Sequence, residues 1–275
     1  MKTKIITSLI LFLSIFINAQ EFIGKATYKT SRKSSFKIGG EKSTMSDAQK
    51  KEIEARLRKM NQKTFTLEFD KSTSTYKQEA KLNAPQPKAG GLTVMSFGGG
   101  TNTDVFYKNI KEKRYANKTS IMGKAFLIKD SLATYDWQLS SETKNIGKYT
   151  CYKATLSKQV DKTSVELVDG KLEEIKKKVT VNTTAWYTPQ VPISNGPSTY
   201  YGLPGLILEI NDGTTTMVCT EIILNPSKKI VIEEPEKGKV VNQKEYNKIS
   251  NQKSKEMLER FRSKDGKGIE INIGG

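Results

Sequence analysis

Histidine, the side chain that most often carries proton transfer and a frequent metal ligand, is missing from this sequence. It has no histidine among its 275 residues. This excludes Ser-His-Asp and Cys-His nucleophilic sites, histidine-ligated zinc and histidine proton shuttles. Chemistry based on carboxylates, on lysine or on oxygen-ligated metals stays open. We therefore expect no cofactor and no metal site, and a protein that is not an enzyme.

The acidic residues do not identify a catalytic pair. Glu173 and Glu174 lie in a charged stretch, while Glu233 and Glu234 precede a proline. A glycosidase needs two carboxylates on opposite sides of a cleft, and sequence spacing does not reveal such an arrangement. Both acidic pairs are typical of solvated surface.

A cluster of aromatic, glycine and proline residues is the most distinctive local feature. Pro204 presets φ and Gly205 accepts a positive φ, which predicts a type II turn over residues 203–206. The next residues, Leu206 to Ile210, lack polar alternation, as is typical of a strand covered on both faces. Rings beside such a rigid frame either line a ligand groove or interface or fill the core beneath it, and we favour the core. The candidate binding or structural residues are Trp186, Tyr187, Pro197, Tyr200, Tyr201, Gly202, Leu203, Pro204 and Gly205.

The first 19 residues have the three parts of a signal peptide. Lys2 and Lys4 form the charged region, residues 5–17 the apolar core, and a small-residue cleavage site ends at Ala19. The apolar run is too short to span a bilayer comfortably, and no cysteine follows the cleavage site. We therefore expect a periplasmic or secreted protein with neither a transmembrane helix nor a lipid anchor.

The sequence is strongly basic, with 46 lysines and arginines against 29 acidic residues. Loss of Lys2 and Lys4 with the signal peptide would lower the net charge from +17 to +15. Such a charge favours anionic surfaces such as lipid headgroups or acidic glycans. Nucleic acid is not an expected partner, because no recognition motif is present and the chain is exported. Because the lysines are scattered along the sequence, their simplest role is solubility and protection of sheet edges.

The chain has two cysteines, Cys151 and Cys219. An even number in an exported chain, with no Cys-x-x-Cys spacing, favours one structural disulfide between them. A two-residue hairpin turn at Asp212 and Gly213 would set Cys219 opposite Leu206, with its thiol on the apolar face. Two buried free thiols are the alternative.

Alternating and apolar runs predict a chain made mostly of strands. The expected strands cover residues 21–32, 64–70, 74–81, 103–119, 123–129, 137–139, 144–156, 206–210 and 214–224, with a short one at 228–233. Residues 157–184 predict an elaborated hairpin with its turn at 168–171. Capping boxes predict helices that begin at Ser46 and at Asn242, the second with a contact between Val241 and Tyr246 across its first turn.

No repeat and no linker divides the mature chain, so residues 20–275 form one domain. Within it, residues 83–100 are expected to be a surface loop and residues 265–275 a loose tail. The expected fold class is mainly β (α+β), with a single curved antiparallel sheet and two helices packed on it. An open half-barrel is one form that such a sheet takes.

Three stretches resemble the GLPGLI family of exported bacterial envelope proteins. Gly202 to Ile207 spells the signature Gly-Leu-Pro-Gly-Leu-Ile, after which the family is named. Gly147 to Ala154 is similar to the family's Gly-Tyr-x-Cys-x-Lys-Ala stretch, with Lys148 inserted, and Ala125 to Trp137 is similar to the segment before it. The resemblance implies an envelope protein, and because the family has no established activity it implies no catalytic residue.

These observations favour a non-enzymatic envelope protein that binds an apolar or amphiphilic ligand, such as a lipid, or an outer-membrane protein. The alternative is a carboxylate-based hydrolase of an envelope polymer, which needs a cleft with paired carboxylates and a perturbed pKa. A third hypothesis is a glycan-binding or adhesion module that uses its lysines, whose binding would weaken in high salt.

Overall fold

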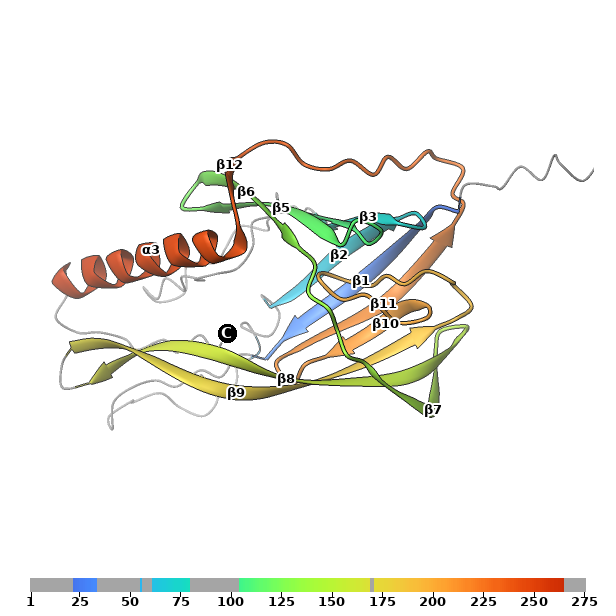
Figure 1. The fold of residues 1–275 in the computed structure, drawn as a ribbon, viewed down its shortest axis with the longest axis horizontal. Helices are drawn as coiled ribbons and strands as arrows, with labels where there is room; N and C mark the ends of the chain where they lie inside the picture. The colour runs from blue at the N-terminus through green and yellow to red at the C-terminus, as the bar shows by residue number, and fades with distance from the viewer. Residues whose placement is uncertain (1–21, 34–54, 56–60, 80–103, 169–170, 265–275) are drawn as a thin grey trace, which may run out of the picture.

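The computed structural model describes residues 22–33, 55, 61–79, 104–168 and 171–264. Their strands form one curved, open, 12-stranded sheet in the order β12-β6-β5-β4-β3-β2-β1-β11-β10-β9-β8-β7 (Figure 1). Neighbouring strands are antiparallel, except that β12 runs parallel to β6. The elements are β1 (Gly24–Arg32), β2 (Gln62–Phe69), β3 (Thr73–Gln78), β4 (Val105–Asn109), β5 (Arg114–Ile121), β6 (Lys124–Ser131), β7 (Gln138–Ile146), β8 (Tyr149–Val168), β9 (Lys171–Thr188), β10 (Leu206–Asn211), β11 (Thr215–Leu224), β12 (Lys239–Val241) and α3 (Gln243–Lys264). The predicted mainly β class with one curved sheet is confirmed.

Strand β1 joins the two halves of the sheet. It lies between β2 and β11, so the start of the domain connects the meander β2–β6 to the later strands β7–β11. Ala26 and Tyr28 alternate with more exposed neighbours and are fully buried. In β2, Leu67 and Phe69 are buried on the same side, as the predicted alternation requires.

Aromatic rings line one side of the sheet from β1 to β6, and we call this side the aromatic face. Its rings are Tyr28, Phe65, Tyr76, Phe106, Tyr115 and Phe126. Phe65 is stacked on Tyr76 with ring centroids 4.8 Å apart, and Phe106 is stacked on Tyr115 at 5.1 Å. Tyr76 is the cross-strand partner of Phe106, so these rings cross neighbouring strands in a row.

Strands β8 and β9 form a hairpin whose outer half extends beyond the rest of the sheet (Figure 1). Their pairing continues to Val168 and Lys171, beside the turn predicted at this position. β7 accompanies β8 only as far as Thr155, and β10 accompanies β9 only from Thr184 onward. The predicted elaborated hairpin is confirmed, and it is a two-stranded ribbon in the described part of the chain.

Residues 225–238, which we call the strap, cross one side of the sheet and lead to β6, where the chain forms the edge strand β12. Ile232 of the strap packs against Tyr107, Ala116 and Leu127. A Cβ at Gly238 would lie 2.6 Å from the carbonyl carbon of Phe126, so only glycine permits this approach to β6. The chain then forms β12 alongside β6.

Helix α3 covers the side of β6 opposite the strap. Tyr246 lies edge-on to Phe126 with ring centroids 5.7 Å apart, and Ile249 joins the same apolar cluster. The predicted capping box is confirmed, because the backbone N–H of Glu245 donates to Asn242 Oδ1 (2.8 Å) and the N–H of Asn242 donates to Glu245 Oε2 (3.1 Å). No helix in the described part of the chain is long and apolar enough to cross a membrane.

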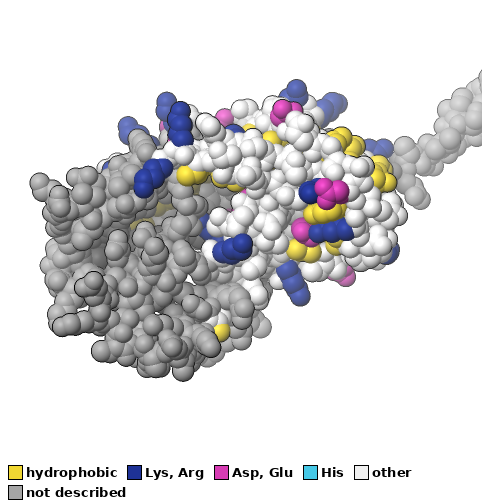
Figure 2. All heavy atoms as spheres, turned by 90° about the horizontal axis from the view of Figure 1, so that it is seen from below, with side chains coloured by type: hydrophobic (Ala, Val, Ile, Leu, Met, Phe, Trp, Pro, Cys, Tyr) yellow, Lys and Arg dark blue, Asp and Glu magenta, His cyan; other side chains and the backbone are white. Residues whose placement is uncertain are grey.

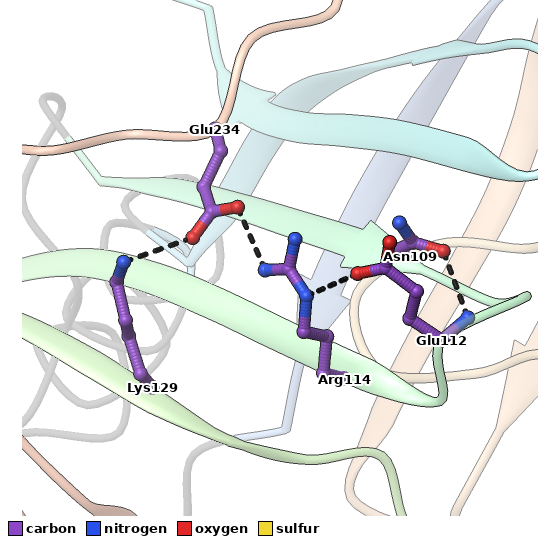
Figure 3. Close-up of polar contacts among 5 residues, drawn as sticks. All are labelled: Asn109, Glu112, Arg114, Lys129 and Glu234. Carbon is purple, nitrogen blue, oxygen red and sulfur yellow. Dashed lines mark hydrogen bonds and ion pairs between the residues drawn. The ribbon is translucent and has the colours of Figure 1, made fainter.

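An ion-pair network fastens the strap to the sheet (Figure 3). Glu234 accepts from Arg114 at 2.7 Å and lies 3.1 Å from Lys129. Arg114 also pairs with Glu112, whose backbone N–H donates to Asn109 Oδ1. Burial opposes the charged form of Glu234, but the hydrogen bonds from Arg114 and Lys129 outweigh it and lower the pKa of Glu234. The prediction that Glu234 is plain solvated surface is therefore wrong.

Several other predictions differ from the structure or fall outside it. Residues 144–156 are not one strand, because Gly147 takes a positive φ and begins the turn between β7 and β8. Residues 228–233 form no strand, because the strap crosses the sheet and does not pair with it. The two predicted helices are not confirmed as a pair: the one that begins at Ser46 lies outside the described residues except for Ala55, which is helical. The 83–100 loop and the 265–275 tail also lie outside them.

Replacing Glu234 by Gln is expected to destabilise the fold by about 1 kcal/mol at neutral pH, because the network is partly exposed. A carboxylate whose pKa is lower in the folded state stabilises the fold when the pH is above its unfolded pKa, which is about 4.3 for Glu. This stabilisation is lost as the pH falls through the pKa of the folded state. The difference between wild type and Glu234→Gln should therefore vanish in acid. Urea unfolding at neutral pH and in acid measures this difference. Glu233→Gln is the control, because Glu233 is the exposed neighbour of Glu234. A difference that persists in acid would contradict the assignment.

Candidate functional site

The connection from β9 to β10, residues 189–205, folds back over the strand that it enters, and we call it the Gly-Pro loop. The N–H of Leu206 donates to Val191 O (3.0 Å) and the N–H of Ile207 donates to Asn195 O (2.9 Å). Val191 and Ile193 of the loop pack with one set of β10 side chains. The β10 side chains on the other face, Ile207 and Ile210, pack in a second apolar cluster. β10 is thus an interior strand covered on both faces, as predicted.

The turn that ends the loop differs from the predicted type II turn. A type II turn would place a hydrogen bond from Leu206 to Leu203, but the N–H of Gly205 donates to Leu203 O (2.8 Å) in a tighter, three-residue turn. Gly205 has a φ of +155°, and a Cβ there would lie 2.2 Å from Thr188 O. Position 205 requires glycine chiefly because the backbone of the loop meets the backbone at Thr188 here.

Lys108 is buried beneath the Gly-Pro loop, although its place within a strand gave no reason to expect this. It is 0% exposed, and its Nζ donates to Gly196 O (2.7 Å) and to Tyr200 O (3.0 Å). Burial holds the pKa of Lys108 well below its ordinary value. A side chain from β4 therefore satisfies two carbonyl groups of a loop that is about ninety residues further along the chain.

Asn195 and Ser74 complete a small polar cluster beside Lys108. Ser74 is the cross-strand partner of Lys108 and is fully buried. Asn195 Oδ1 accepts from the N–H of Gly196 (2.8 Å) and lies 3.5 Å from Ser74 Oγ. Asn195 Nδ2 is buried and has no hydrogen-bond partner among the described residues. The cluster holds the loop in place, and no carboxylate from the described ranges of the chain belongs to it.

Four aromatic rings, Tyr135, Trp137, Tyr200 and Tyr201, clasp the outer side of the loop. Tyr135 lies 5.9 Å from Tyr200 and 5.6 Å from Tyr201, and Trp137 lies 6.4 Å from Tyr200, between ring centroids. Trp137 Nε1 donates to Tyr201 O (2.9 Å), and the Tyr201 hydroxyl donates to Ala133 O (2.9 Å). We call these four residues the aromatic clasp. Tyr135 and Trp137 were not predicted from the sequence as residues of the site.

The predicted site residues do not all meet. Pro197 and Leu203 are buried within the loop, and a Cβ on Gly202 would lie 3.7 Å from Trp137 Nε1. Trp186 and Tyr187 are consecutive in β9 and therefore point to opposite faces. Trp186 lies beneath Lys144, whose Nζ is 4.4 Å from the ring centroid, while Tyr187 is buried and lies beside Tyr152.

The described ionisable groups do not form an evident reaction centre. No cluster of three potential metal ligands is present in the described part of the chain. Backbone hydrogen bonds from Gln243 and Ser131 lower the pKa of Asp130. Because the pKa of Glu234 is lowered as well, both carboxylates are charged near neutral pH and are poor proton donors. The site is built from packing, carbonyl groups and aromatic rings.

The predicted disulfide is not formed, and both cysteines are buried free thiols. β8 and β11 are separated by β9 and β10. This spacing is roughly 14 Å along the sheet, against a limit of about 7 Å between bonded Cα atoms. The predicted register is also wrong, because a longer turn pairs Glu209 with Val218 and Ile210 with Met217. The thiol of Cys219 does lie on the predicted apolar face, in the same cluster as Cys151.

Gly205→Ala is expected to destabilise the protein by about 1–3 kcal/mol, because the new Cβ would overlap the backbone at Thr188. Gly213→Ala is the matched control. Gly213 also has a positive φ (+86°), but nothing lies within 4 Å of its Cβ position, so it should lose only about 1 kcal/mol. Thermal unfolding of both variants measures the difference. Equal losses would show that the close approach at Gly205 is unimportant.

Both thiols should be inert in the native protein. Burial raises the pKa of Cys151 to about 11 and that of Cys219 to about 12, and the thiolate is the reactive form. Iodoacetamide should leave the native chain unmodified and should alkylate both cysteines in guanidinium without reductant, as read by mass spectrometry. Alkylation that requires a reductant would instead reveal a disulfide.

Comparisons with known proteins give two structural matches and one family model. Two structures of PNGF-II, in the C2 and P21 space groups, match 84% of this chain at 14% identity and a TM-score of 0.47. The match covers 33% and 34% of those chains, so this chain spans about a third of their length. None of the curated proteins matches. Residues 137–209 match a family model described as a protein of unknown function (Porph_ging). The matched stretch contains Trp137 and the whole Gly-Pro loop, so the chain is similar to this family through the candidate site.

Proposed function

We propose that this protein is a non-enzymatic, exported envelope protein that binds an apolar or amphiphilic ligand against its aromatic face. The observation that supports this proposal is the row of rings formed by Phe65, Tyr76 and Phe106 across β2, β3 and β4. Tyr76 is buried in the middle of the row, whereas Phe65 and Phe106 are only partly buried. Partly exposed rings beside a buried one provide the flat apolar contact that an acyl chain requires.

The apolar clusters around this row support an apolar ligand over a polar substrate. Two apolar clusters meet at Phe106, one extending toward β11 and the other toward α3. Burial raises the pKa of Tyr76 above its ordinary range, and burial also raises the pKa of Tyr115 to about 12. These hydroxyls therefore remain neutral, and the row of rings carries no charge that would oppose a hydrocarbon chain.

The proposal that the protein is not an enzyme rests on chemistry rather than on comparison. The sequence contains no histidine, and the described carboxylates with shifted pKa values are shifted downward. General acid catalysis near neutral pH needs the opposite shift. Export is proposed from the N-terminal pattern of residues 1–19. A membrane-protein surface that presents apolar side chains is the other partner that this face would accept.

The test combines extraction of the native protein with a binding assay. Organic extraction followed by mass spectrometry should recover an amphiphile, and a fluorescent acyl-chain probe should bind the delipidated protein. Phe106→Ser should weaken probe binding about tenfold, because it removes apolar contact from the row of rings. Leu139→Ser is the control, since Leu139 is 59% exposed on the edge strand β7, which five strands separate from β2.

Equal probe affinity for Phe106→Ser and wild type would overturn the assignment of the ligand to this face. Circular dichroism and thermal unfolding must show that each variant is folded. Phe65→Ser provides a second variant on a different strand, so the test does not depend on one substitution. Absence of any extracted amphiphile together with no probe binding would reject the carrier function itself.

A further inference from the structure

Lysines that are scattered in the sequence come together at one rim of the sheet. This rim is the end at which β1 begins and β11 ends, on the right in Figure 1. Because neighbouring strands are antiparallel, every second turn of a meander returns to the same end. The lysines in these turns are Lys71, Lys111, Lys113, Lys148, Lys228 and Lys229, and we call them the basic rim.

Backbone hydrogen bonds hold successive turns of the rim together. The N–H of Ile110 donates to Ser72 O (2.8 Å), which joins the turn after β2 to the turn after β4. The N–H of Leu132 donates to Lys113 O (2.9 Å), and the N–H of Asn225 donates to Ile23 O (2.8 Å). From β11 to β5 the rim crosses six adjacent strands, a span of about 24 Å that holds five of the six lysines. Lys148 lies further along the same end, in the turn between β7 and β8. The charges are therefore presented by a connected edge.

The six lysines are exposed, and none of them makes an ion pair within the described residues. The acidic residues of the same turns are engaged elsewhere: Asp70 accepts the N–H groups of Ser72 and Thr73, and Glu112 pairs with Arg114. Figure 2 shows both charges side by side on the described part of the face seen from below. The lysines of the rim outnumber the acidic residues of the same turns, so the rim carries a net positive charge.

Exposed apolar side chains lie beside these lysines. Ile223 and Leu224 are 40% and 37% exposed at the end of β11, and Val231 is 57% exposed in the strap. They flank Lys228 and Lys229 in the sequence. Lysines next to exposed aliphatic groups form the combination that recognises a charged bilayer, since headgroups take the ammonium groups and the acyl boundary takes the apolar ones.

We propose that the basic rim docks the protein on a membrane surface that contains anionic lipid. The contact is peripheral: the lysines lie among phosphate-bearing headgroups, and Ile223, Leu224 and Val231 enter the interface between headgroups and acyl chains. An acidic polysaccharide would satisfy the lysines but would offer no apolar region to these three side chains. The proposal is independent of a ligand on the aromatic face.

Vesicle sedimentation tests the rim directly. The mature protein should bind vesicles of phosphatidylglycerol and phosphatidylethanolamine in equal parts and should bind phosphatidylcholine vesicles at least about tenfold more weakly. Combining Lys71→Gln, Lys111→Gln and Lys113→Gln should weaken binding to the anionic vesicles by about tenfold or more. These side chains are exposed in turns, so folding should be unchanged, which circular dichroism verifies.

The control removes the same charge from the opposite rim. Lys33, Lys63 and Lys124 lie where β1 ends and where β2 and β6 begin. The triple variant that combines Lys33→Gln, Lys63→Gln and Lys124→Gln should bind nearly as well as wild type. Equal loss in both triple variants would overturn the proposal, because net charge alone would explain binding. Val231→Ser should weaken the binding that persists at high salt, where lysine contacts are screened. Binding to a sulfated polysaccharide but not to anionic vesicles would also overturn it.

Discussion

The buried amine of Lys108 is the contact on which the candidate site depends. Placing an ammonium group in the interior is costly unless it is hydrogen-bonded, and here two carbonyl groups from the Gly-Pro loop accept from it. The dependence is mutual, because Gly196 O and Tyr200 O are turned toward the sheet and would lose a strong donor without this lysine. A single side chain thus joins the middle strand of the first meander to the connection between β9 and β10.

The constraint at Lys108 determines what the surrounding residues must be. A Cβ at Gly196 would lie 2.8 Å from the side chain of Ile207, so glycine lets the loop approach both Lys108 and β10. The aromatic clasp then closes the loop from its outer side through Trp137 Nε1 and the Tyr201 hydroxyl. With Gly205 close to Thr188 on the remaining side, the loop is fixed at each of its boundaries. Its rings are accordingly part of the architecture of the loop.

Local sequence signals predicted local structure well, and failed where structure depends on distant contacts. The capping box at Asn242, the alternation in β2 and the long β8–β9 hairpin were all predictable, because each involves neighbouring residues. Lys108 resembles any strand lysine in sequence, since its partners lie 88 and 92 residues away. The disulfide failed for a related reason: two cysteines share a cluster, but strand order sets their separation. β12 is too short to give a periodic signal, and it forms only because the strap carries the chain to β6.

The same distinction applies to charge. In sequence the lysines are dispersed, which favours a general role in solubility. An antiparallel meander sorts its turns alternately between two ends, so residues separated by two strands in the chain become neighbours at one rim. Lys71 and Lys111 are forty positions apart, yet their turns are joined by the hydrogen bond from Ile110 to Ser72. Dispersed lysines in a β-meander are therefore compatible with a focused electrostatic surface. In this chain the sorting places exposed lysines at the rim, whereas Lys108 on the aromatic face is buried against two loop carbonyl groups.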